Sequence, residues 1–151
     1  MIMLKNKKKI VLFLLLIISF HSFAQNESKA KQLIQNLSWD SFYFQVNYGT
    51  ALILNDDSKE LIEIGKGCSI DLLEELKTTE KSVVIHMILT KIWEPEVFFW
   101  KQHFHENTQN EEWYFIEYSL NNLSWNESKD KSSVDPFEVN RIYNYWTNRI
   151  K

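Results

Sequence analysis

The stretch DSKELIEIGKGCSIDLLEELKTTEKSVVIHMILTKIW, residues 57–93, decides the fold, because its apolar residues recur at the three- and four-residue spacing of amphipathic helices. Ser58 is the predicted N-cap of a first helix, and Gly65 and Gly67 supply the left-handed residues that end it. Ser69 is the predicted N-cap of a second helix, and a longer third helix follows. The pattern therefore predicts a helical hairpin whose longer helix is buried, because that helix is apolar over a wide arc.

The same segment resembles a single helical repeat of the HEAT family. The resemblance covers residues 58–93 and lies in the runs Leu61-Ile62-Glu63-Ile64-Gly65, Leu72-Leu73-Glu74-Glu75-Leu76, Val83-Val84 and Leu89-Thr90-Lys91-Ile92. Thr78 and Ser82 stand where the inter-helix turn of this family usually carries aspartate and arginine, and the pattern does not recur at a period of roughly 40 residues. The resemblance implies a protein-binding scaffold rather than a catalyst.

Residues on either side of this hairpin add one more helix and several strands. Apolar residues at helical spacing predict a short amphipathic helix over residues 27–37. Near alternation predicts a strand over residues 42–48, whereas residues 51–54 fit a helix or a strand. After Pro95 the period changes to two, which predicts a strand over residues 97–105.

The C-terminal part of the chain predicts an antiparallel meander followed by a helix. A second strand is expected over residues 113–119 and a third from residue 123, with a charged, serine-rich loop over residues 128–133. Asp135, with a proline and a glutamate behind it, then has the chemistry of an N-cap. We therefore predict an α+β fold: N-terminal helices including the hairpin, then a small antiparallel β-meander covered by a C-terminal helix.

The first 24 residues differ from everything that follows. Four lysines precede an apolar run of 11 residues, and Ser22-Phe23-Ala24 ends the segment with small residues at the positions a signal peptidase reads. We predict a signal peptide over residues 1–24 and one globular domain over residues 25–151. An apolar run this short does not span a bilayer, so no stable membrane anchor is expected after cleavage. The composition is that of a bacterial exported protein, periplasmic or secreted.

The charge balance of the mature chain argues against some classes of binding partner. All four charged residues of the leader are lysines, so the remaining chain has 13 basic and 20 acidic residues and a formal charge of −7. No cluster of lysine and arginine is present to neutralise phosphates, which argues against a nucleic-acid partner and favours another protein. Cys68 is the single cysteine and closes no disulfide within the chain. The sequence does not fix an oligomeric state.

Few residues carry recognisable chemistry. His103 and His105 lie two apart on an expected strand, where both imidazoles can reach one ion, so they are the candidate zinc ligands. The alternative is a solvated strand face, and no third ligand is fixed by the sequence. His86 is expected to be a hydrogen-bonded histidine at the border of the core. Cys68 precedes a predicted helix, which suits either a reactive thiol or a small buried residue.

Aromatic residues are concentrated in the meander, with nine of them between Trp93 and Tyr118. Alternate residues of a strand face opposite ways, so Trp100, Tyr114 and Tyr118 are the candidate ligand- or partner-binding residues of an exposed strip. The alternative is that the C-terminal helix covers that face.

Three classes of function follow from these features. The favoured class is an exported, non-enzymatic protein-interaction module of inhibitor or immunity type, which needs no cofactor and binds a basic protein through its acidic surface. The second is a glycan- or ligand-binding module that uses the aromatic strands. The third is a small metal-dependent hydrolase at His103 and His105. No catalytic motif is recognisable, so an enzymatic function is the less favoured hypothesis.

Overall fold

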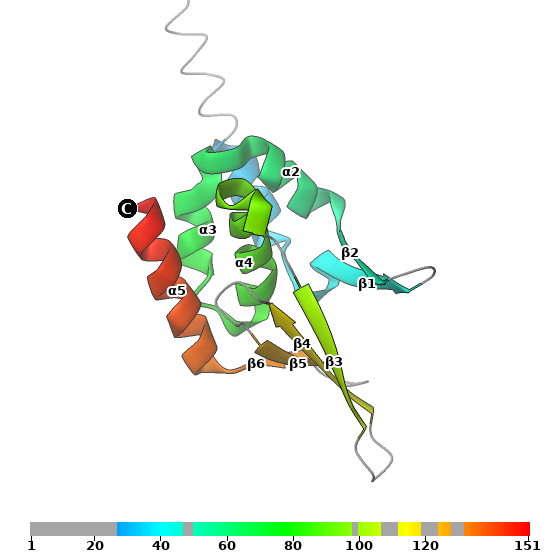
Figure 1. Ribbon diagram of the computed structural model, residues 1–151. Helices are drawn as coiled ribbons and strands as arrows, with labels where there is room; N and C mark the ends of the chain where they lie inside the picture. The colour runs from blue at the N-terminus through cyan, green and yellow to red at the C-terminus, as the bar shows by residue number, and fades with distance from the viewer. Residues whose placement is uncertain (1–26, 47–49, 98–99, 107–111, 119–123, 128–131) are drawn as a thin grey trace, which may run out of the picture.

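The computed structural model describes residues 27–46, 50–97, 100–106, 112–118, 124–127 and 132–151 (Figure 1). Their elements form an α+β fold, as the sequence predicts, with helices packed together on one side and strands extending from them. Residues 27–35 are helical. The other helices are α2 (Asp56–Ile64), α3 (Ser69–Glu75), α4 (Thr79–Trp93) and α5 (Pro136–Ile150), with short 3-10 turns at Trp39–Ser41, Gly65–Cys68 and Pro95–Val97.

The strands form two antiparallel sheets. β1 (Phe42–Val46) pairs with β2 (Thr50–Leu54) in an antiparallel arrangement. Residues 51–54, which fit a helix or a strand by sequence, therefore form a strand. The second sheet is a meander in sequence order. Its strands are β3 (Trp100–Glu106), β4 (Glu112–Tyr118), β5 (Ser124–Glu127) and β6 (Ser132–Val134).

Helix α4 is the centre of the core. Its residues 82–90 are all buried, and six apolar side chains among them are at most 1% exposed: Val83, Val84, Ile85, Met87, Ile88 and Leu89. Helices α2, α3 and α5 contact it, and so does β6. The helix ends at Trp93 because Pro95 disfavours a helical conformation at Glu94. Burial around nearly the whole circumference matches the wide apolar arc of its sequence.

Several helix ends differ from the sequence prediction. Asn55, not Ser58, is the N-cap of α2, and its side chain accepts a hydrogen bond from the Ser58 amide at 2.9 Å. Gly65 ends α2 with φ of 71°, as expected, whereas Gly67 has no positive φ. Ser69 does not cap α3 but is its first residue, after Cys68 at the N-cap, and its hydroxyl accepts a hydrogen bond from the Trp93 indole at 2.9 Å.

Two strand predictions also need correction. The strand expected over residues 97–105 is described from Trp100 onward, residues 95–97 form a 3-10 turn, and residues 98–99 lie outside the described part of the chain. The segment 128–133, predicted to be a loop, includes the start of β6 at Ser132. Such a three-residue edge strand is too short to show periodicity.

The C-terminal helix begins as predicted but packs elsewhere. Asp135 caps α5 by accepting from the Phe137 amide at 2.8 Å, and Pro136 occupies the first turn. Its buried face consists of Val139, Ile142 and Trp146, with Tyr143 partly buried beside them. These residues face α3 and α4, however, so the expectation that α5 covers the sheet is wrong. Figure 1 shows α5 at the outer edge of the helical layer, with the C-terminus at its far end.

Candidate functional site

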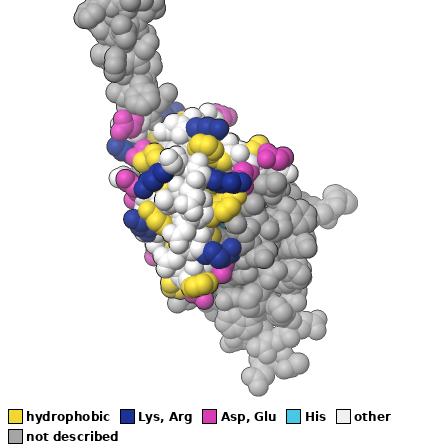
Figure 2. Space-filling model, turned by 60° about the vertical axis from the view of Figure 1, so that its left-hand side comes forward, with side chains coloured by type: hydrophobic (Ala, Val, Ile, Leu, Met, Phe, Trp, Pro, Cys, Tyr) yellow, Lys and Arg dark blue, Asp and Glu magenta, His cyan; other side chains and the backbone are white. Residues whose placement is uncertain are grey.

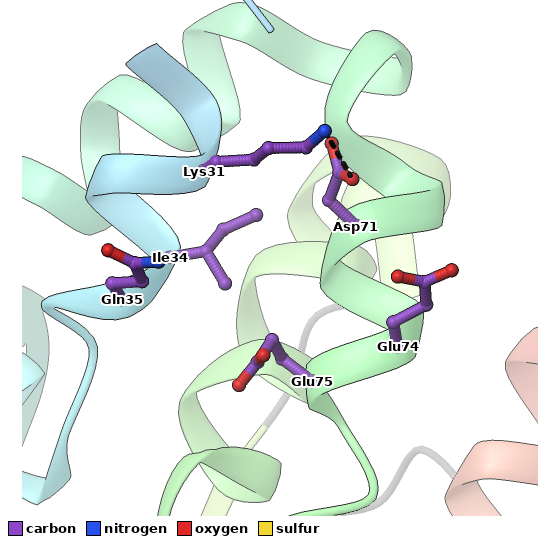
Figure 3. Close-up of a pocket in the computed structure, with 6 residues that line it drawn as sticks. All are labelled: Lys31, Ile34, Gln35, Asp71, Glu74 and Glu75. Carbon is purple, nitrogen blue, oxygen red and sulfur yellow. Dashed lines mark ion pairs between the residues drawn. The ribbon is translucent and has the colours of Figure 1, made fainter. Parts of the chain in front are cut away.

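A groove of about 190 Å³ lies between the helix of residues 27–35 and α3. Figure 3 shows Lys31 and Asp71 pointing toward each other across the space between these two helices. The lining residues are Lys31, Ile34, Gln35, Asp71, Glu74 and Glu75. Three of the six are acidic, and none is a hydroxyl, thiol or imidazole residue. The groove therefore suits recognition of a cation rather than nucleophilic chemistry.

Two amphipathic helices create the groove. The apolar residues of the helix of residues 27–35 are buried, and Ile34, at 2% exposed, is the apolar residue of the lining. Lys31 and Gln35, four residues apart, lie on the exposed side of the same helix. In α3, Leu72 and Leu73 are buried, which leaves the neighbouring carboxylates at the surface. The groove is thus the seam where the polar edges of the two helices meet.

The Lys31 ammonium only partly neutralises the groove. Its Nζ lies 2.8 Å from Glu27 Oε1 and 4.0 Å from Asp71 Oδ1. The hydrogen bond with Glu27 is the main reason that the pKa of Lys31 is raised. Burial raises the pKa of Asp71, against the opposing effect of Lys31, and the nearby charges of Glu27 and Glu74 raise it further. A carboxylate with a raised pKa is one that gains from an additional cation beside it.

Lys81, at the start of α4, fixes one end of the groove. Its Nζ donates to the backbone carbonyls of Ile34 and Gln35 at 3.1 and 3.3 Å, which lie at the C-terminal end of their helix. It also lies 3.4 Å from Glu75 Oε2. A cation on the last carbonyls of a helix is a favourable end-cap. Glu75 is therefore held by Lys81, whereas Glu74 is exposed.

Sequence reasoning missed this groove. It did not single out Lys31, Asp71 or Glu74 as functional residues. The two sides of the groove are about 40 residues apart in the chain, and no local pattern brings them together. The sequence signal that could have indicated the groove was a pair of polar residues on one face of the first helix, Lys31 and Gln35, together with the acidic residues of α3.

The candidate residues of the meander are described through their backbone positions. Trp100 pairs with Tyr118 across β3 and β4, and Tyr114 pairs with Phe104. The two histidines lie on β3 as predicted, where His103 pairs with Phe115 and His105 with Trp113. Their side chains lie outside the described part of the structure. The zinc site and the aromatic strip therefore both stay predictions.

His86 is a core histidine. It is 1% exposed, and its Nδ1 accepts a hydrogen bond from the Trp146 indole at 2.9 Å. The two rings are tilted, with centroids 5.9 Å apart. The sequence-based interpretation of a hydrogen-bonded histidine is confirmed, although the residue lies in the core rather than at its border. This contact joins α4 to α5.

Cys68 is a buried thiol. It is 1% exposed, and its Sγ lies 3.1 Å from the Gly65 carbonyl and 3.5 Å from the Leu61 carbonyl. Burial raises the pKa of Cys68 to about 11. The thiol is therefore protonated at neutral pH, which suits a packing residue and argues against a nucleophile.

A second polar cluster lies at the C-terminal end of α4. Glu94 is 6% exposed and accepts hydrogen bonds from the Tyr145 hydroxyl at 2.7 and 2.8 Å. Arg149, one turn further along α5, forms an ion pair with the same carboxylate and lies 4.8 Å from the Tyr145 ring. Since all donors of this cluster point at one carboxylate, it acts as a clamp between α4 and α5.

Comparison with known proteins gives no match: no protein-family model fits the sequence, and no curated protein or solved structure is similar to it. The resemblance to a HEAT repeat therefore stays a prediction. Among the described residues no group of three histidine, cysteine, aspartate or glutamate side chains is placed to hold a metal ion. In the part of the chain that the structure describes, no helix is both long and apolar enough to cross a membrane.

Proposed function

We propose that the protein is exported and acts as a non-enzymatic interaction module, of inhibitor or immunity type, that binds a basic segment of another protein. The observation that carries the proposal is the groove between the helix of residues 27–35 and α3, where three carboxylates lie beside a buried isoleucine. Export rests on the lysine-rich, apolar character of residues 1–24.

The groove has the size and chemistry to receive a lysine or arginine side chain. Its volume of about 190 Å³ is below that of typical small-molecule pockets, which hold roughly 300–1,000 Å³. Asp71 and Glu74 suit the charged end of such a side chain. The excess of acidic residues in the whole chain would also speed the encounter with a basic partner.

The test is capture of partner proteins from the envelope and the culture medium of cells that produce the protein. We expect a stoichiometric basic partner that binds at low salt and is released at about 1 M salt, where the screening length is roughly 3 Å. Glu74→Lys should weaken this binding at least fivefold, or about 1 kcal/mol, because it reverses an exposed charge of the groove.

Glu63→Lys is the matched control. Glu63 is also an exposed helical glutamate, but it lies in the last turn of α2, outside the groove. The control should bind as the unchanged protein does. An equal loss of binding in both variants would show that the net charge of the protein, and not the groove, controls binding. The absence of any basic partner would contradict the proposal.

A glycan-binding function is the second candidate. The observation in its favour is the backbone register of β3 and β4, which places Trp100 directly opposite Tyr118. Cross-strand aromatic neighbours can form a platform for a sugar ring. Trp100→Ala should then abolish a change of tryptophan fluorescence on addition of oligosaccharides. If oligosaccharides cause no change in the unaltered protein, this candidate fails.

A further inference from the structure

The predicted cleavage leaves a glutamine at the first position of the mature chain. Removal of residues 1–24, which accompanies the proposed export, frees the α-amine of Gln25. An N-terminal glutamine holds a nucleophile and an electrophile in one residue, because its α-amine can reach its own side-chain amide carbon in a five-membered ring. Gln32 and Gln35 have the same side chain but no free α-amine. Gln25 is therefore a candidate site of covalent modification.

Ring closure at such a terminus is an intramolecular substitution that balances by itself. The lone pair of the α-amine attacks the Cδ carbonyl carbon, a new C–N bond closes the lactam, and the bond from Cδ to the side-chain nitrogen breaks. That nitrogen leaves as ammonia and takes one proton from the amine, so no oxidant, reductant or second substrate is needed. Because α-amines of proteins lose their proton near pH 8, part of them is reactive at neutral pH.

The helix of residues 27–35 has charged contacts close to this terminus. Glu27 is exposed, and its Oε1 lies 2.8 Å from Lys31 Nζ. Figure 2 shows magenta acidic and dark blue basic side chains close together at the upper end of the described surface. Two residues of chain span at most about 7 Å, less than the screening length of roughly 8 Å at physiological salt. A free α-ammonium on Gln25 therefore competes with Lys31 for the Glu27 carboxylate.

A positive charge at this place also opposes the helix itself. The mature chain starts at Gln25, so the N-terminal end of this helix lies within two residues of Glu27. Such an end carries a partial positive charge from its unsatisfied N–H groups and favours acidic or neutral groups. Glu27 and Lys31 already have the favourable order, with the acidic residue four positions before the lysine. A lactam has no charge, so ring closure removes the unfavourable one and leaves this pair undisturbed.

We propose that Gln25 of the exported protein is converted to pyroglutamate, and that the uncharged terminus stabilises the helix of residues 27–35. This helix forms one wall of the groove, so the modification supports the surface that carries the proposed function. The inference rests on the proposed export and on cleavage after Ala24. It does not depend on the binding of a basic partner.

The test is mass spectrometry of the N-terminus after export. The full chain with its leader is expressed in a bacterium, and the protein is purified from the envelope or the medium. Its free amines are dimethylated before digestion, because a dimethylated terminus cannot cyclise during sample preparation. We expect an N-terminal peptide that starts at residue 25, has no methyl label on its α-nitrogen and is about 17 Da lighter than the peptide with an open glutamine.

Gln25→Asn is the matched control. Asparagine keeps the amide and the α-amine, but its side chain is one carbon shorter, so ring closure would produce a strained four-membered ring. This variant should carry the methyl label on residue 25. At low salt its melting temperature should be about 1–4 °C below that of the unaltered protein, because the ammonium stays beside the helix end. At about 1 M salt the difference should disappear.

The possible results separate this inference from the other proposals. A labelled, open Gln25 would overturn the inference and leave export in place. A peptide that starts anywhere other than residue 25 would overturn the inference together with the predicted cleavage. An unlabelled terminus in Gln25→Asn would overturn it as well, since another modification would then block the amine. Equal melting temperatures of the two proteins would overturn the effect on the helix. Capture of a basic partner is a separate measurement, so the binding proposal can fail while this inference holds.

Discussion

Replacement of Trp146 by phenylalanine tests how α5 is attached to the core. Trp146 is fully buried and donates its indole N–H to His86 Nδ1 at 2.9 Å. Trp146→Phe removes this donor from a buried acceptor, which costs about 1–3 kcal/mol. The smaller ring also leaves a cavity that costs about 1 kcal/mol at ~24 cal/mol per Å³. We therefore expect the free energy of unfolding to fall by about 3 kcal/mol.

A double-mutant cycle with His86→Leu separates the hydrogen bond from the packing. Each single variant leaves one buried polar group without this partner, whereas the double variant removes both groups. The combined loss should therefore be smaller than the sum of the single losses by about 1 kcal/mol or more. Urea unfolding followed by far-ultraviolet circular dichroism measures all four proteins, since this signal does not depend on Trp146. Additivity to within about 0.3–0.5 kcal/mol would refute the reasoning.

Three further predictions concern other contacts of the helical layer. Gly65→Ala should lower the free energy of unfolding by about 1–2 kcal/mol, because Gly65 has a φ of 71°. Gly67→Ala, at a glycine without a positive φ, should change it little, and equal effects of the two variants in a thermal melt would contradict this explanation. The pKa of Cys68 is raised from 9.0 to about 11, so the thiol loses its proton at lower pH in the unfolded chain than in the folded one. The free energy of unfolding should therefore fall as the pH rises from about 9 to about 11, and in urea titrations Cys68→Ala should lack this part of the pH dependence. Glu94→Gln should cost about 1–2 kcal/mol, since the amide keeps an acceptor for Tyr145 but loses the charge that pairs with the half-exposed Arg149; unchanged stability in urea would show that the clamp contributes nothing.

The sequence predicted the helices well because their signals are local. The apolar arc of α4 and the Asp-Pro start of α5 each lie within one element, and both elements are present as expected. Helix α2 shows the limit of such signals. Four consecutive residues, Asn55 to Ser58, all have side chains that can cap a helix, so the residue type alone cannot select Asn55 over Ser58.

Features that join distant segments were not predictable in this way. The placement of α5 against α3 and α4 depends on the Trp146–His86 hydrogen bond and on the Glu94 clamp, which link residues more than 50 positions apart. The groove likewise needs Lys31 and Asp71 to meet across two helices. A single sequence shows which face of each helix is apolar, but it does not show which faces meet.

The contact between the groove and a basic partner is most directly tested by zero-length carbodiimide cross-linking of the captured complex, with the joined residues located by mass spectrometry. The reagent joins a carboxylate to a lysine only where the two are in direct contact. We predict cross-links from Asp71 and Glu74 to lysines of the partner, and their loss at high salt. Cross-links that arise from Glu63 or other carboxylates of α2, with none from the groove, would contradict the account.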